Sequence, residues 1–136
     1  MDELQGLIKG APNFLRYVVV AFALTIAFLS LYVWVTPWRE MELIRKGNTA
    51  AALSFSGSLI GFCMPLANTI AHSVSPLDVV VWALVALVVQ ILVHFATRVA
   101  LPNLKQQIED DHASAGIFAG ALAFGFGLLN AACLTY

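Results

Sequence analysis

Charged and apolar positions are segregated along the chain: four long stretches without a charged side chain are separated by short charged segments. A transmembrane helix needs about 20 predominantly apolar residues, within a range of roughly 17 to 25. All four stretches are long enough to meet this requirement. The pattern therefore predicts four transmembrane helices, over Tyr17–Thr36, Thr49–Ala71, Leu77–Thr97 and Ser114–Leu134.

Composition supports the same fold class. Of the 136 residues, 60% are hydrophobic and only 11% are charged, whereas about 25% of the residues of a soluble domain are charged. A soluble protein of this size could not cover its surface with so few polar groups. We therefore predict an all-α integral membrane protein that forms one membrane domain over residues 1–136 and has the lipid bilayer as its solvent.

Charge and motif content exclude several function classes. A net charge of −1 gives no basic patch for phosphates and argues against a nucleic-acid partner. Cys63 and Cys133 fall in different predicted helices without metal-ligand spacing, so we expect both to be small packing residues. The sequence has no nucleophile–base pair, phosphate-binding glycine loop, zinc signature or nucleotide fingerprint. We therefore expect no catalytic residues, no cofactor, no metal and no enzyme activity.

An internal repeat is predicted by self-alignment. Shifting the chain by about 64 residues places the first predicted helix on the third and the second on the fourth, with Gly61 on Gly125 and Phe62 on Phe126. Two-helix units restore the chain direction, so the repeats would be parallel and related by an axis along the membrane normal. The two predicted units cover residues of about 14–72 and about 77–136.

The segments that link the helices within each unit follow one plan. Each begins at a proline, Pro37 or Pro102, which the first turn of a helix tolerates. Each continues through a short charged stretch and ends at a residue that can cap the next helix, Asn48 or His112.

The distribution of positive residues predicts the orientation in the membrane. Lys9 and Arg16 lie on the side of the N-terminus, whereas five basic residues lie on the opposite side: Arg39, Arg45, Lys46, Arg98 and Lys105. Cytoplasmic loops carry an excess of Lys and Arg. We therefore expect the loops after the first and third helices to be cytoplasmic and both termini to be periplasmic.

The second and fourth predicted helices carry small residues at helical steps, unlike the bulkier first and third helices. These candidate packing residues are Gly57, Gly61, Gly116, Gly120, Ala123 and Gly127. Rows of small residues let helix backbones approach closely, which drives association in lipid. We expect the second and fourth helices to be central, packed on each other or on a second subunit. A homo-oligomer is expected, with a dimer favoured.

The third predicted helix carries a polar stripe on one face, formed by Gln90, His94, Thr97 and Arg98. Polar groups at membrane depth are costly, so this face should point into protein or water. One interpretation is a path for an ion or proton in which His94 titrates near neutral pH. The alternative is hydrogen bonding between helices, with Arg98 reaching the headgroups.

Two long motifs carry a family resemblance. The segment 47–57, the dipeptide Pro65-Leu66 and the ending 129–136 closely resemble the YjfL family of small bacterial inner-membrane proteins, a domain of unknown function. The resemblance implies a bacterial inner-membrane location and four helices. It implies no activity, substrate, cofactor or catalytic residue.

Two functions therefore stay open. The first is a self-associating structural or interaction subunit of the cell envelope that also docks other membrane proteins. The second is an oligomeric channel or transporter component, with a polar path lined by the third helix.

Overall fold

The computed structural model describes residues 2–134, which form six helices. Their bounds are α1 Asp2–Val35, α2 Glu40–Arg45, α3 Thr49–His72, α4 Pro76–Ala100, α5 Leu104–Glu109 and α6 Ala113–Cys133. Thr135 and Tyr136, which end the second predicted repeat, lie outside the described residues.

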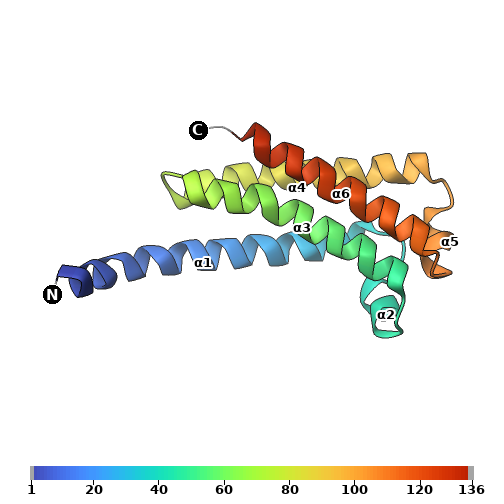
Figure 1. The fold of residues 1–136 in the computed structure, drawn as a ribbon, viewed down its shortest axis with the longest axis horizontal. Coiled ribbons are helices and arrows are strands. Elements are labelled where there is room, and N and C mark those ends of the chain that lie inside the picture. The colour runs from blue at the N-terminus through green and yellow to red at the C-terminus, as the bar shows by residue number, and fades with distance from the viewer. Residues whose placement is uncertain (1, 135–136) are drawn as a thin grey trace.

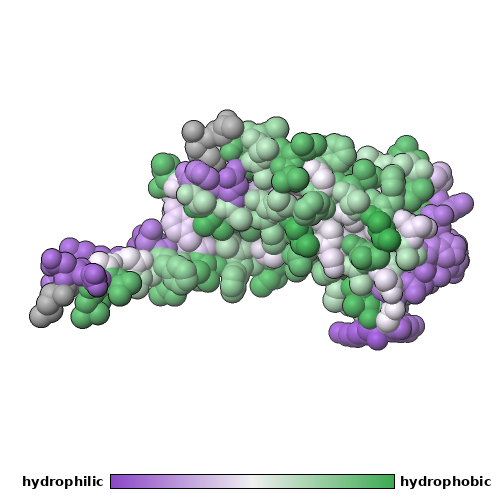
Figure 2. All heavy atoms as spheres, in the orientation of Figure 1, coloured by the Kyte–Doolittle hydropathy of each residue, from purple (hydrophilic) through white to green (hydrophobic). Residues whose placement is uncertain are grey.

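The four long helices, α1, α3, α4 and α6, are each long and apolar enough to cross a membrane. The prediction of an all-helical fold with four spans is confirmed. The long helices lie side by side, with the start of α1 and the end of α6 toward one end of the bundle and α2 and α5 at the other (Figure 1). Hydrophobic residues cover the body of the molecule and hydrophilic residues gather at the two ends (Figure 2), as a bilayer requires.

The predicted start of the first helix was wrong. Three of the long helices begin and end within a few residues of their predicted bounds, but α1 begins at Asp2 instead of Tyr17. Its first half extends beyond the rest of the bundle (Figure 1), and residues 2–16 are exposed. The error arises because the length of a charge-free stretch gives only the apolar part of a helix. Lys9 and Arg16 are good helix formers, so the helix can continue past them outside the apolar layer.

The two linking segments have the same backbone design. Each contains a six-residue helix, α2 or α5, followed by a residue with positive φ, Gly47 (+86°) or Asp111 (+57°). The N–H of Gly47 donates to the carbonyl of Ile44, and that of Asp111 donates to the carbonyl of Ile108, both at 3.0 Å. Glycine adopts this conformation freely and Asp is among the few other residues that tolerate it.

The cap predictions had different outcomes. The Asn48 side chain accepts a hydrogen bond of 2.8 Å from the N–H of Ala51, so the predicted cap of α3 is confirmed. His112 stands at the corresponding position before α6, but its side chain forms no cap hydrogen bond and that prediction was wrong. Imidazole is not among the short oxygen-bearing side chains that reach back to the first turn of a helix.

Helices α3 and α6 run parallel and pack backbone to backbone. A Cβ atom added to Gly57 would collide with the backbone of Gly120, and one added to Gly127 would collide with the backbone of Gly61. Gly116 meets the first turn of α3 in the same way, and Ala123 is buried beside Gly61. All six candidate packing residues therefore lie in the contact between α3 and α6 of a single chain.

Polar bonds connect α3 to α6 at one end and to the linker that precedes α6 at the other. The Asn48 amide, before the first turn of α3, donates to the carbonyl of Ile108 in α5 at 2.7 Å. At the other end, the Asn68 amide donates to the carbonyl of Ala131 at 2.8 Å. These bonds fix the register of α3 and α6 along the bundle.

The outer helices complete the core. α4 packs on both α3 and α6, and α1 packs on α3 and α4. The rings of Phe28 and Phe62 stack 4.3 Å apart between α1 and α3, beside the buried residues Val79, Ala83 and Ala86 of α4. This cluster fills the half of the bundle nearest the termini with apolar side chains.

Candidate functional site

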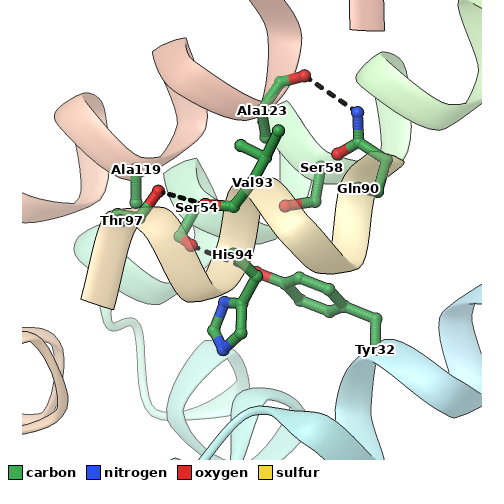
Figure 3. Close-up of a pocket in the computed structure, with 9 residues that line it drawn as sticks. All are labelled: Tyr32, Ser54, Ser58, Gln90, Val93, His94, Thr97, Ala119 and Ala123. Carbon is green, nitrogen blue, oxygen red and sulfur yellow. Dashed lines mark hydrogen bonds between the residues drawn. The ribbon is translucent and has the colours of Figure 1, made fainter. Parts of the chain in front are cut away.

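Polar side chains from three helices converge in the other half of the bundle, toward α2 and α5. They surround a cavity of about 10 Å³, which is about the space that one water molecule needs. The lining residues are Tyr32, Ser54, Ser58, Gln90, Val93, His94, Thr97, Ala119 and Ala123 (Figure 3). We refer to Tyr32, Ser54, Ser58, Gln90, His94 and Thr97 as the buried polar cluster.

Three of the four residues in the predicted stripe belong to this cluster. Gln90, His94 and Thr97 are buried by protein. Arg98 lies outside the cluster, on the exposed side of α4, with its guanidinium 5.7 Å from the centre of the Phe95 ring. The stripe is therefore divided into a sealed interior part and an exposed end.

Hydrogen bonds satisfy part of the cluster. The Gln90 amide donates to the carbonyl of Ala123 at 3.0 Å. The hydroxyls of Tyr32 and Ser54 are 3.2 Å apart, and both bonds are drawn in Figure 3. The side-chain oxygen of Gln90 and Nε2 of His94 have no hydrogen-bond partner among residues 2–134 although both are buried. Since buried polar atoms are normally paired, a water in this cavity would be well placed to serve them.

Glu40, the first residue of α2, adds a carboxyl group to this end of the bundle. Its exposed fraction is 0%. One oxygen accepts a hydrogen bond of 2.6 Å from the indole N–H of Trp38, and the other oxygen has no hydrogen-bond partner in the part of the chain that the structure describes. Trp38 is also buried, and its ring centre lies 5.8 Å from that of His94. Glu40 and Trp38 thus close the loop end of the polar cluster.

The protonation of Glu40 follows from its surroundings. Burial raises the pKa of the carboxyl from 4.5 to about 8, and the hydrogen bond from Trp38 and the nearby Tyr32 hydroxyl only partly oppose that shift. By contrast, the exposed Glu42 has a lowered pKa because it bonds Lys46 and Arg39. A carboxyl with a pKa of about 8 is mostly neutral at pH 7.

Sequence reasoning missed Glu40 because a charged residue in a short linker is usually solvated. A signal was nevertheless available from the self-alignment. At the offset of about 64 residues, Glu40 corresponds to Leu104, which is buried at the start of α5. An apolar residue at the equivalent position of the other linker indicates an interior place. Tyr32 was missed because it lies inside an apolar span and carries no charge.

The cluster is closed toward the termini. Phe28 lies one helical turn from Tyr32, and Phe62 lies one turn from Ser58. The rings of Phe28 and Phe62 stack on each other and form an apolar layer below the cluster. Ala86, one turn from Gln90, belongs to the same apolar layer. On the opposite side, only the linker residues Trp38 and Glu40 separate the cluster from an open groove that both of them line, so water reaches the polar half most easily from the side of α2 and α5.

Comparisons with known proteins agree on a membrane family. A family model described as Domain of Unknown Function (DUF350) matches residues 4–134. The chain is 40% identical to the UPF0719 inner membrane protein YjfL of Escherichia coli (strain K12) over 123 residues, covering 90% of this chain and 93% of the relative. It is 29% identical to the UPF0719 transmembrane protein YshE of Bacillus subtilis (strain 168) over 122 residues, or 85% and 88% of the two chains. No solved structure matches the chain.

Proposed function

The chain belongs to the DUF350 family and is a multi-pass inner-membrane protein, and from this premise we propose that it is a structural subunit of the cell envelope that associates with a second copy through α6. The associating surface is the face of α6 turned away from α3.

The observation that carries this proposal is an uncovered pair of small residues on α6. The exposed Ala121 and the half-buried Gly125 lie four residues apart on one face, between the larger exposed side chains of Ile117 and Leu128. A Cβ atom added to Gly125 would meet nothing within 4 Å, unlike one at any of the five glycines packed between α3 and α6. Small residues on a lipid-facing surface permit the close backbone approach that stabilises helix pairs in membranes.

The proposed internal repeat supports the same face. At the offset of about 64 residues, Ala121 and Gly125 correspond to Gly57 and Gly61, and these two glycines of α3 are covered by α6. The matching six-residue helices and positive-φ residues of the two linkers support the repeat itself. A helix from a second copy would contact Ala121 and Gly125 of α6 as α6 contacts Gly57 and Gly61 of α3. In a symmetric dimer, this surface would be covered in both copies at once.

The charged end of the bundle suits contact with other membrane proteins. A groove between α2 and α5 is lined by both acidic and basic side chains: Arg39, Glu42, Lys105 and Glu109. In the proposed orientation this end faces the cytoplasm and both termini face the periplasm. The orientation is supported by the excess of Lys and Arg in the two linkers.

Enlarging Gly125 tests the association. Gly125→Ile is expected to weaken the dimer by at least about tenfold, because the added side chain separates the two backbones. The measurement is the mass of the purified protein in lipid nanodiscs across a dilution series. Ala23→Ile, a matched enlargement on the exposed surface of α1, should leave the dimer intact. An unchanged mass for Gly125→Ile, or equal weakening by both variants, would contradict the proposal.

A transporter component is the second candidate, favoured by the cavity and its two unpartnered polar atoms. Because the stripe is sealed within one chain, such a component would move a proton or small ion by rearrangement and not through an open pore. Proteoliposomes under a pH gradient should then show flux that His94→Leu reduces at least about tenfold, while Arg98→Gln retains it. Flux no greater than that of empty liposomes would exclude this candidate.

A further inference from the structure

Glu40 carries a carboxyl group into the interior of the bundle, at the point where the linker enters the polar half. The side chain has an exposed fraction of 0%, although the residue lies in a six-residue helix outside the four spans. Trp38 supplies one donor to one oxygen, and the second oxygen is unpartnered. A carboxyl group that only keeps the protein surface hydrated would be exposed to water, so the buried position of Glu40 indicates another role.

No cation forms an ion pair with Glu40 within residues 2–134, although Arg39 and Arg45 line the open groove beside it. Tyr32 approaches from α1, and its hydroxyl also interacts with Ser54 of α3. From α4, His94 contacts the ring of Trp38, and Arg98 of the same helix is exposed and stands over Phe95. Within residues 2–134, the ion pairs of the linker acids involve Glu42 and not Glu40.

These surroundings favour a neutral carboxyl. An ionised carboxylate buried with the Trp38 N–H as its donor, the Tyr32 hydroxyl nearby and no ion pair among the described residues would lose more hydration free energy than these groups return. The neutral group retains the bond from Trp38 and gains an O–H that can donate. The raised pKa of Glu40, about 8 because of burial, agrees with this geometry.

The same surroundings disfavour a metal ion. The indole N–H of Trp38 points at one carboxyl oxygen and would repel a cation there. Residues 2–134 contain no group of three His, Cys, Asp or Glu side chains that could hold a metal. The enclosed cavity of the polar cluster, about 10 Å³, accommodates one water and not a hydrated ion. The larger open groove that Glu40 also lines, about 390 Å³, carries Arg39 and Arg45, whose positive charges would repel a metal cation.

We infer that Glu40 is a proton-binding site that exchanges its proton with water on the side of α2 and α5 and adjoins the buried polar cluster through the Tyr32 hydroxyl. Its ligand is the proton itself. The carboxyl loses that proton to water as the pH rises, and the charge that appears lies beside Tyr32, Trp38 and His94. The site does not depend on association through α6, and either can fail without the other.

Labelling with the apolar reagent dicyclohexylcarbodiimide, which reacts with protonated carboxyls, tests this site. The full chain in lipid nanodiscs is labelled between pH 6 and pH 10 and the modified residue is located by mass spectrometry. Glu40 should be labelled at pH 7, and the rate should fall about tenfold by pH 9 as the carboxyl ionises. Glu42, exposed and ionised, serves as the internal control and should stay unlabelled at both pH values.

Two matched changes sharpen the test. Glu40→Gln should remove the label, and Trp38→Phe should move the midpoint of the pH profile upward because a hydrogen bond that favours the ionised form is lost. Infrared difference spectra of the unaltered protein provide a second readout. They should show a protonated carboxyl band at pH 7 that disappears by pH 10.

The inference is overturned by absent labelling of Glu40 together with an absent carboxyl band, or by labelling that does not change with pH. Protection of Glu40 by sodium ions at constant pH would also overturn it, because the site would then bind a metal cation.

Discussion

Replacing Gly120 by leucine is expected to prevent stable folding of the bundle. Gly120 touches the backbone of α3, and a side chain there would meet the carbonyl and main chain of Leu53. Backbone atoms cannot rotate away as side chains do, so α3 and α6 must separate. Overpacking a helix contact of this kind costs roughly 3 kcal/mol or more. The result should be loss of the monodisperse species and a large fall in the melting temperature in detergent.

Gly125→Leu is the matched control for this experiment. It makes the same substitution five residues further along the same helix, where a Cβ atom has open space. The fold should therefore survive, and only association should weaken. Equal stability of the two variants would show that α3 and α6 do not pack through their glycines. Equal loss of folding in both would show that leucine is rejected by α6 for another reason.

The stability of the bundle should fall as the pH rises from about 5 to about 9. Glu40 has a pKa of about 8 in the folded protein and 4.5 as its ordinary value. Between these values the folded state holds a proton that the unfolded state has lost, so each step up in pH favours unfolding. Below pH 4.5 both states are protonated and this penalty is absent. The full effect is on the order of a few kcal/mol, or several degrees in melting temperature.

Glu40→Gln isolates this contribution. Glutamine keeps the size and the acceptor oxygen of the neutral acid but cannot ionise, so its melting temperature should stay nearly constant over this range. Glu42→Gln should leave the slope of the unaltered protein in place, since Glu42 is exposed. A slope that persists in Glu40→Gln would assign the pH dependence to other groups and contradict the interior position of Glu40.

The parts of the fold that the sequence predicts are those set by the membrane. Long apolar stretches separated by charges require helices, so the spans of α3, α4 and α6 were predicted within a few residues. The extension of α1 was missed because the bilayer does not determine the structure of residues 2–16. The small residues Gly57 and Gly120 identified the central helices, but their pattern alone could not decide between a partner within the chain and a second copy.

The candidate site was predicted only in part. Gln90, His94 and Thr97 were found because polar residues are conspicuous in an apolar span. Their closure within one chain depends on how α1 and α3 pack, which no local pattern encodes. Glu40 was missed because its burial results from the path of the linker, which turns Trp38 and the carboxyl inward. Comparison with Leu104 in the second linker is the observation that would have revealed it.

Cysteine cross-linking along α6 in native membranes tests the proposed association most directly. Cys63 and Cys133 are first replaced by alanine, and single cysteines are then placed at positions 117, 121, 125 and 128. Oxidation should give dimers at 121 and 125, weak dimers at 128 and few at 117, with none at Ala23 of α1. Cross-linking that is equal at all positions, or absent at 121 and 125, would contradict a dimer formed through this face of α6.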